Sequence, residues 1–155
     1  MGGQYCVGGF AWVWPDYLDG LQNIYNRPFP NKMGVAYPGF NAFYAEGGWG
    51  DIPWKIPVDP STFQATLDLA AEKTDIIQLV TWNDYGEGTI IEPTLEFEYS
   101  YLEILQRKTG APYTVDDLRH LTDIFNSRVK YGNDPKMSKE LEQHHYEFVR
   151  GVRRH

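Results

Sequence analysis

The stretch Ile-Ile-Gln-Leu-Val-Thr-Trp-Asn-Asp-Tyr-Gly-Glu-Gly, residues 76–88, combines the clearest strand signal in this sequence with a dense group of polar side chains. Its first part, Ile76–Trp82, is an almost continuous run of apolar and β-branched residues, as is typical of a buried strand in a parallel sheet. Aromatic, acidic, amide and glycine residues follow directly. We therefore predict a strand over 76–82 that leads into a loop able to carry a functional site.

Two earlier segments repeat the pattern of a strand followed by a loop. Residues Val7–Trp14 form an apolar run that stops at Pro15, and Val7–Trp12 is predicted as a strand. Residues Met33–Tyr37 form a second predicted strand. It opens into a long loop, residues 40–57, that is rich in aromatic residues and glycine, and loops of this length in compact domains are usually functional.

One helix is predicted between the second and third strands. Asp59 or Ser61 can cap it, and Pro60 suits its first turn. Its apolar residues recur at helical spacing, at Phe63, Leu67, Ala70 and Ala71. Strand, loop, helix and strand thus alternate as in a parallel sheet, so the predicted fold class is α/β. Three or four strands cannot close an eight-stranded barrel, which leaves either a portion of a longer barrel or a small open α/β domain.

The C-terminal third is predicted to be helical. One helix begins near Thr94 and stops at Gly110, with an apolar stripe at Tyr99, Leu102 and Leu105. Thr114 and Asp117 fit a capping box for a second helix, and Ser138 is the expected cap of a third. We therefore divide the chain into residues 1–110, a partial (β/α) barrel with the polar loop, and residues 111–155, a helical extension of the same domain.

Composition and charge exclude several classes of protein. The chain has 155 residues, of which 42% are apolar and 23% charged, so neither disorder nor a fibrous repeat is expected. A net charge of −7 repels phosphate groups, which argues against a nucleic-acid partner. No stretch approaches the roughly 20 apolar residues that cross a bilayer, and the N-terminus has no signal-peptide pattern. The expected location is either intracellular or, for a piece of a longer secreted precursor, extracytoplasmic.

Asp84 and Glu87 are the candidate catalytic residues. They lie three positions apart, just after the carboxyl end of the predicted strand, which is the catalytic end in α/β barrels. Cleavage of a glycosidic bond needs one protonated carboxylic acid for the leaving oxygen and one ionised carboxylate as base or nucleophile. A solvated acidic turn is the alternative, because two acidic residues at this spacing often occur by chance.

Neighbouring side chains suit a carbohydrate ligand. Trp82 and Tyr85 offer flat apolar faces on which a sugar ring can stack. Asn83 offers amide donors and an acceptor for sugar hydroxyl groups. We therefore predict that these three residues bind substrate.

Four further aromatic residues and one carboxylate are candidates for substrate binding, and all except Tyr44 have an alternative interpretation. Tyr44 and Trp49, on the long loop, either line substrate subsites or, for the tryptophan, cover the core. Trp12 and Trp14 end the first strand, where substrate contacts and core packing are the alternatives and core packing is slightly favoured. Glu92 either binds sugar or caps the helix that begins near Thr94.

Residues Ile76–Pro93 resemble the catalytic-loop signature of glycoside hydrolase families 71 and 99. The segment Trp82-Asn-Asp-Tyr-Gly-Glu87 is similar to family 71, which contains α-1,3-glucanases. Gly88-Thr89 and Ile91-Glu92-Pro93 are similar to family 99, which contains endo-acting α-mannosidases. Two upstream segments add to the resemblance: Tyr37-Pro38-Gly39-Phe40 with family 99, and Gly9-Phe10-Ala11-Trp12 with family 71.

This resemblance implies a (β/α)8 barrel, of which the chain would be the C-terminal portion. Glu87 matches the acid/base position of both families, whereas Asp84 matches family 71 and is one methylene group shorter than the glutamate of family 99. The implied substrate is an α-linked polysaccharide or glycan, and the families use no metal or cofactor. Nor do His144 and His145 predict a metal site, because adjacent residues on a helix point to different faces.

Three functions remain in competition. The first is hydrolysis of an α-linked polysaccharide or glycan by Asp84 and Glu87. The second is a carbohydrate-binding or inactive partial-barrel protein, in which the same aromatic residues bind sugar. The third is a protein that pairs with another copy through open sheet edges, which can coexist with the first, because an open edge seldom stays unpaired.

Overall fold

The computed structural model describes residues 7–152. The start of the predicted segment 1–110, residues 1–6, and the end of the predicted segment 111–155, residues 153–155, lie outside the described residues. The chain divides into two compact units. Unit 1 extends to Leu102, and unit 2 begins at Glu103.

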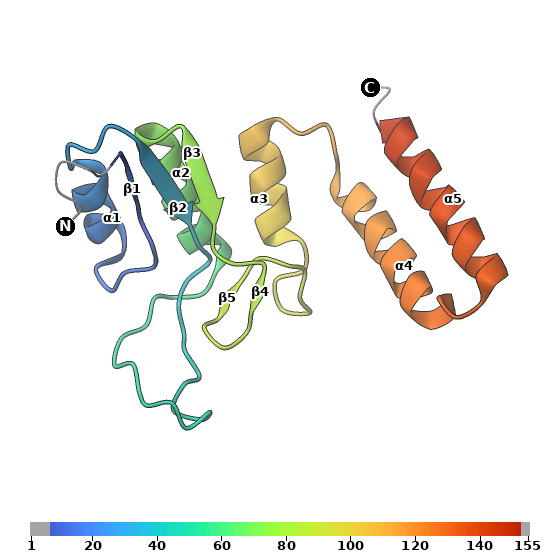
Figure 1. The fold of residues 1–155 in the computed structure, drawn as a ribbon, viewed down its shortest axis with the longest axis horizontal. Helices are drawn as coiled ribbons and strands as arrows, with labels where there is room; N and C mark the ends of the chain where they lie inside the picture. Colours follow the sequence, from blue (N-terminus) through green and yellow to red (C-terminus); the bar gives the residue numbers. More distant parts are fainter. Residues whose placement is uncertain (1–6, 153–155) are drawn as a thin grey trace. The chain divides into compact units, whose positions relative to one another are not determined.

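Unit 1 contains a three-stranded parallel sheet (Figure 1). Its spatial order is β1 (Gly9–Phe10), β2 (Lys32–Ala36) and β3 (Ile76–Leu79). The three predicted strands and their parallel direction are therefore confirmed. Strands β1 and β3 are shorter than predicted, and β2 has the predicted length but begins one residue earlier. The ladder of hydrogen bonds continues one step beyond the strands, since Ala11 N–H donates to Met33 O (3.3 Å) and Val80 N–H donates to Ala36 O (2.9 Å).

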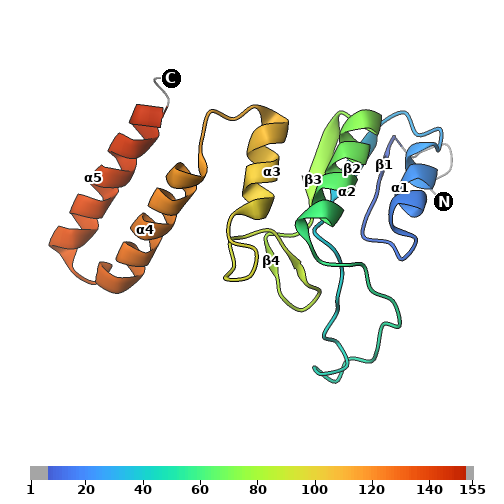
Figure 2. The same ribbon diagram turned by 180° about the vertical axis from the view of Figure 1, so that it is seen from behind.

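Two helices, α1 (Tyr17–Tyr25) and α2 (Pro60–Lys73), cover one face of the sheet (Figure 2). The protein is thus of mixed α/β class. Helix α2 packs closely on β2 at Gly34, where a Cβ atom would lie only 2.8 Å from the Ala70 side chain. We did not predict α1, because its nine residues are too few for a clear periodic pattern.

The start of α2 agrees with its sequence signals. Asp59 is the cap, and its carboxylate accepts hydrogen bonds from Ser61 N–H (2.6 Å) and Thr62 N–H (3.2 Å). Pro60 occupies the first turn. The predicted apolar face is buried at Phe63, Leu67 and Ala70, but Ala71 is exposed. The reason is that the buried face also includes two hydroxyl-bearing residues, Thr62 and Thr66, which shift it away from Ala71.

The buried core of unit 1 lies between the sheet and these helices. Its members come from the ends of the strands and from both helices, and include Ala11, Leu21, Val35, Tyr37, Ala70 and Val80. Thr66 is fully buried, and its Oγ1 accepts a hydrogen bond from Tyr37 N–H (3.1 Å) just after β2 ends. This bond ties α2 to the point where the chain leaves the sheet.

The other face of the sheet carries exposed apolar side chains. Phe10, Met33 and Ile76 are register partners across the three strands. Their exposed fractions are 66%, 37% and 60%. Because the strands are parallel, the loops that follow them open at one edge of the sheet, as predicted (Figure 1).

Helix α3 (Ser100–Thr109) begins later than predicted. Residues 94–98 form a turn instead, in which Glu98 N–H donates to Thr94 O (2.9 Å). The predicted stripe is displaced by one position, because Tyr101 and Ile104 are buried whereas Tyr99, Leu102 and Leu105 are half-buried. Gly110 follows the helix with a φ of +66°, which confirms it as the stop.

Unit 2 contains a helical hairpin of α4 (Val115–Tyr131) and α5 (Pro135–Val152). The predicted capping box of Thr114 and Asp117 is confirmed. The predicted cap Ser138 is wrong, because α5 begins three residues earlier at Pro135. Asp134 caps it by accepting hydrogen bonds from Lys136 N–H (2.9 Å) and Met137 N–H (3.2 Å). Within the described part of the chain, the helices lack the combination of length and apolar character that a membrane span requires.

Candidate functional site

Asp84 and Glu87 lie in a short hairpin that follows β3, here called the carboxylate loop (residues 81–92). The hairpin pairs β4 (Asn83–Asp84) with β5 (Thr89–Ile90) in antiparallel register. Asp84 Oδ1 accepts a hydrogen bond from Glu87 N–H (3.1 Å), and Asp84 N–H donates to Thr81 Oγ1 (3.0 Å). The structure therefore brings the two carboxylate residues together, and both are half-buried.

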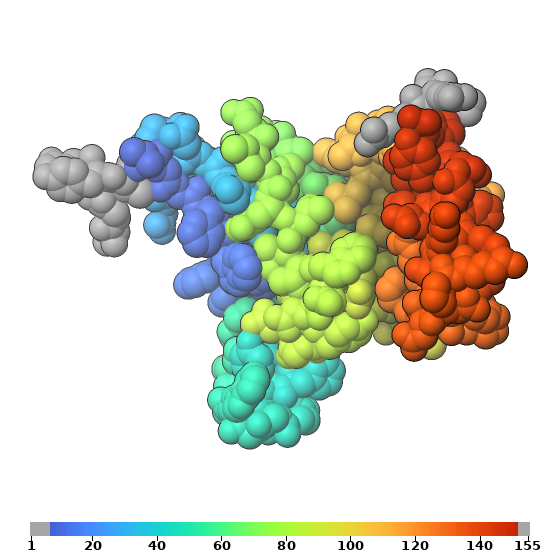
Figure 3. All heavy atoms as spheres, turned by 45° about the vertical axis from the view of Figure 1, so that its right-hand side comes forward, coloured from blue at the N-terminus to red at the C-terminus, as the bar shows by residue number. Residues whose placement is uncertain are grey.

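The long loop projects from the rest of unit 1 between Phe40 and Ile56 (Figure 3). Its base is closed by a two-way bridge, in which Phe40 N–H donates to Ile56 O (3.0 Å) and Ile56 N–H donates to Phe40 O (2.8 Å). The ring of Phe40 also stacks on Trp54 at 4.3 Å. The loop is thus held at its base by backbone and aromatic contacts.

Backbone hydrogen bonds attach the start of the long loop to the carboxylate loop. Asn41 N–H donates to Glu87 O and Phe43 N–H donates to Gly86 O, both at 2.9 Å. The approach requires a glycine at position 88, whose φ is +69° and where a Cβ atom would lie 3.3 Å from Asn41 O. These hydrogen bonds hold the backbone of Glu87 in place beside the start of the long loop.

Tyr44 is the residue of the long loop that contacts a carboxylate. Its hydroxyl group donates a hydrogen bond to Glu87 Oε1. This bond to a carboxylate, with a smaller contribution from burial, raises the pKa of Tyr44 to about 12. The hydroxyl therefore stays protonated at neutral pH and remains a donor to Glu87.

Trp49 lies further along the same loop. Its ring centroid is 6.0 Å from that of Tyr44, and Trp49 N–H donates to Tyr44 O (2.9 Å). The side chain is 82% exposed, so the interpretation of Trp49 as a cover over the core is wrong. An exposed indole beside the Tyr44–Glu87 pair is available to stack on a ligand.

A second tyrosine–carboxylate pair lies within the carboxylate loop. Tyr85 hydroxyl donates to Glu92 Oε1 (2.6 Å), and this hydrogen bond raises the pKa of Tyr85. Glu92 does not cap α3, which begins only at Ser100, so that interpretation is wrong. Trp82 and Tyr85 are both more than half exposed, and Asn83 is exposed as well.

The two tryptophans after β1 are also exposed. Trp12 and Trp14 have exposed fractions of 46% and 51%, so core packing, the slightly favoured interpretation, is wrong. The buried positions alternate with them, at Ala11 and Val13. Trp12 lies at the same sheet edge as the carboxylate loop, but it belongs to neither tyrosine–carboxylate pair.

Two residues of this site were not predicted. Thr81 holds the carboxylate loop by accepting from Asp84 N–H and by bonding to Thr89 O (2.7 Å). Asn41 attaches the long loop to Glu87. The place of Thr81 directly before Trp82 is a weak local signal for its contact with Asp84. Nothing near Asn41 in the sequence indicates its contact with Glu87.

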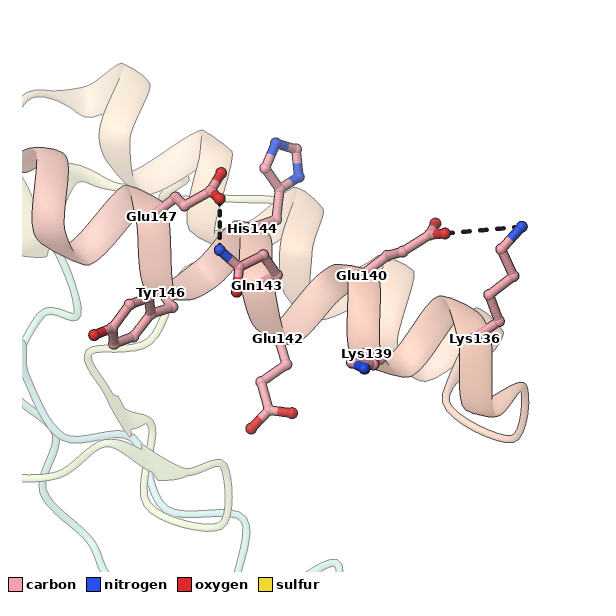
Figure 4. Close-up of a pocket in the computed structure, with 8 residues that line it drawn as sticks. All are labelled: Lys136, Lys139, Glu140, Glu142, Gln143, His144, Tyr146 and Glu147. Atoms are coloured by element: carbon pink, nitrogen blue, oxygen red, sulfur yellow. Dashed lines mark hydrogen bonds and ion pairs between the residues drawn. The ribbon is translucent and has the colours of Figure 1, made fainter.

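A shallow hollow of about 700 Å³ lies elsewhere, along α5 (Figure 4). Helix α5 supplies all of its lining side chains, and they pair along that helix, Gln143 with Glu147 at 2.6 Å and Lys136 with Glu140 at 3.9 Å. This hollow is a solvated helix surface. Over residues 7–152, no three His, Cys, Asp or Glu side chains gather closely enough to hold a metal ion.

Comparison of the chain with protein-family models, with curated proteins and with solved structures gives no match.

Proposed function

We propose that this chain supplies the catalytic loop of a glycoside hydrolase that cleaves an α-linked polysaccharide or glycan. The observation that carries the proposal is the position of Asp84 and Glu87. They follow β3 at the carboxyl edge of a parallel sheet, which is the edge where α/β barrels hold their active sites. Exposed Trp82 and Tyr85 in the same loop support a sugar as the ligand.

We further propose that the sheet belongs to a (β/α)8 barrel, of which this chain is the C-terminal portion. Helices cover one face of the sheet, as they cover the outside of a barrel. The other face exposes Phe10, Met33 and Ile76, and layers of apolar side chains fill the interior of a barrel. Both observations support this architecture.

In the proposed reaction, Glu87 is the general acid and Asp84 is the base. Glu87 gives its proton to the glycosidic oxygen as the bond between that oxygen and the anomeric carbon breaks. Asp84 accepts a proton from the attacking hydroxyl group as the oxygen of that group bonds to the anomeric carbon. The attacking group is either water, which completes hydrolysis, or the 2-hydroxyl of the sugar, which gives a 1,2-anhydro sugar that a water molecule then opens. Tyr44 orients Glu87 through its hydrogen bond, and the Tyr85–Glu92 pair offers donors and acceptors to sugar hydroxyl groups.

The test is hydrolysis of α-1,3-glucan and α-mannan oligosaccharides by the protein that carries the complete barrel. Glu87→Gln removes the proton but keeps size and hydrogen bonding, so turnover should fall by about two to four orders of magnitude. Asp84→Asn should cause a similar loss. Asp75→Asn, at an exposed carboxylate before β3, is the matched control and should leave turnover unchanged. Wild-type turnover in both site variants would contradict the proposed chemistry.

The alternative is a carbohydrate-binding or inactive partial-barrel protein. The observation that favours it is the exposure of Trp49, Trp82 and Tyr85 on a sheet of only three described strands. Calorimetric titration with the same oligosaccharides separates the two functions. Binding that depends on Trp82 without any hydrolysis would favour the alternative, and association of the chain through its sheet edges would be compatible with either.

A further inference from the structure

Helix α4 of unit 2 carries an apolar stripe, defined as Leu118, Leu121, Phe125 and Val129. These residues recur at spacings of three or four, so they lie along one side of the helix. Leu121 is 36% exposed, Phe125 64% and Val129 72%. Single exposed apolar residues are ordinary, but a continuous stripe of them marks an interaction surface.

The contact between α4 and α5 involves the side of α4 that borders the stripe. The ring of His120 lies 4.8 Å from that of Phe148 on α5, and Ile124, one turn further along α4, is buried. Leu141 of α5 is buried as well. The hairpin therefore has its own small core. Leu118 and Leu121 of the stripe line a hollow of about 240 Å³ with His145, Phe148 and Val149 of α5, and Phe125 and Val129 continue the stripe beyond that hollow.

Two opposite charges flank one border of the stripe. Asp117 and Arg128 are eleven residues apart, which is about three helical turns, so they project at nearly the same angle. Leu118 and Val129 are also eleven residues apart. Asp117 uses Oδ2 to hold Thr114 in the capping box, and Arg128 is exposed.

This spacing is self-complementary for two antiparallel copies of α4. A two-fold axis near Asp123 sets Leu118 against Val129 of the second copy and Leu121 against Phe125 of the second copy. The same axis sets Asp117 of each copy against Arg128 of the other copy, which gives two pairs of opposite charge. A parallel pairing would instead oppose like charges, Asp117 with Asp117 and Arg128 with Arg128.

We propose that two copies of this chain associate through α4, with the stripes packed antiparallel about that two-fold axis. The two hairpins then form a four-helix bundle with an isologous interface. Helix α4 has 17 residues, so at about 1.5 Å per residue the seam is roughly 25 Å long. Helix α4 belongs to unit 2 and the carboxylate loop to unit 1, and the inference does not depend on the proposed glycosidase activity.

The first experiment is sedimentation velocity of the full chain over a range of concentrations. A dimer is expected, and Phe125→Asp combined with Val129→Asp should raise its dissociation constant at least about a hundredfold, because each charge would be buried in an apolar seam. Tyr146→Asp, at an exposed aromatic residue of α5, is the control and should leave the dimer intact. A monomeric wild type would overturn the proposal. So would a dimer that survives the changes in α4 but is lost in the double variant Phe10→Asp with Ile76→Asp, which alters the exposed face of the sheet.

The second experiment tests register and charge. In a Cys6→Ser background, chains carrying Leu121→Cys and chains carrying Phe125→Cys are mixed and oxidised. Disulfide dimers between the two different variants should dominate, and dominance of dimers of one variant would overturn the antiparallel register. Arg128→Glu should weaken association about tenfold more than Lys130→Glu, which makes the same charge change away from the stripe. Equal effects of the two changes would overturn the charge pairing.

Discussion

The hydroxyl group of Tyr44 donates a hydrogen bond to Oε1 of Glu87, a residue 43 positions further along the chain. With the backbone bonds from Asn41 and Phe43, it makes a third link between the long loop and the carboxylate loop. Tyr44 thus holds the side chain of Glu87 through Oε1, and the second carboxylate oxygen, Oε2, takes no part in this hydrogen bond. Tyr44 is thus better described as a positioning residue for Glu87 than as a simple sugar contact.

The titration of Tyr44 gives a direct test of this link. Glu87→Gln removes the carboxylate that raises the pKa of Tyr44, so this pKa should fall from about 12 toward the ordinary value near 10. The measurement is the pH dependence of the tyrosine 13Cζ chemical shifts, with Tyr44→Phe for assignment. Glu92→Gln is the matched control, because it should lower the pKa of Tyr85 and leave Tyr44 unchanged. A Tyr44 signal that does not respond to Glu87→Gln would show that the pair is not formed in solution.

The cap of α2 predicts a pH-dependent stability. Asp59→Ala should lower the free energy of unfolding by about 1 kcal/mol at neutral pH. The Ser61 hydroxyl and the backbone N–H donors lower the pKa of Asp59, so its stabilisation is present above the ordinary carboxyl pKa and is lost as pH falls through the lower folded value. The difference between wild type and Asp59→Ala should therefore shrink below about pH 4.

Urea unfolding followed by tryptophan fluorescence measures this effect, because all five tryptophans lie in unit 1. Asp59→Asn is the control, since asparagine caps helices about as well but does not titrate. A gap between wild type and Asp59→Ala that stays constant down to pH 2 would contradict the assigned role.

The buried hydroxyl of Thr66 predicts a larger loss. Thr66→Val keeps the shape of the side chain but leaves Tyr37 N–H without its acceptor inside the core, which should cost about 1–3 kcal/mol. The same fluorescence measurement gives the change in stability. Hydrogen exchange at the Tyr37 amide should also become faster in the variant, and an unchanged exchange rate would count against this hydrogen bond.

Gly88 predicts strain in the carboxylate loop. An alanine at this position would have to adopt a φ of +69° with its Cβ atom 3.3 Å from Asn41 O, at a cost of roughly 1–2 kcal/mol. Faster hydrogen exchange at the Asn41 amide should accompany the loss of stability. Gly47→Ala, at a position with ordinary contact distances of 3.6 Å and more, should change stability by less than about 0.5 kcal/mol. Equal effects of the two substitutions would argue against the close approach.

Local patterns predicted much of this fold. The three strands, the Asp59 cap, the Thr114–Asp117 capping box and the stop at Gly110 all depend on neighbouring residues, and the structure confirms them. The errors have local causes too. The turn over 94–98 delays α3 and shifts its buried stripe, and Pro135 allows α5 to begin before Ser138.

Contacts between distant residues could not be predicted in this way. The acidic pair Asp84 and Glu87 was recognisable as a candidate from its place after a strand. The bonds that orient Glu87 come from Asn41 and Tyr44, whose local sequence carries no signal of their partner. Exposure of Trp12 was also missed, because an apolar run does not reveal which of its alternating side chains face a packed neighbour.

Because the base of the long loop is closed, the tip of the loop, residues 45–53, can change in sequence or length independently of the base. The Phe40–Ile56 bridge and the bonds from Asn41 and Phe43 hold the loop on either side of residues 45–53. Insertions, deletions or grafts in that tip leave these anchors, and hence the backbone at Glu87, where they are. If the proposed function holds, exchange of the tip would change the side chains beside the Tyr44–Glu87 pair while the carboxylate loop keeps its shape.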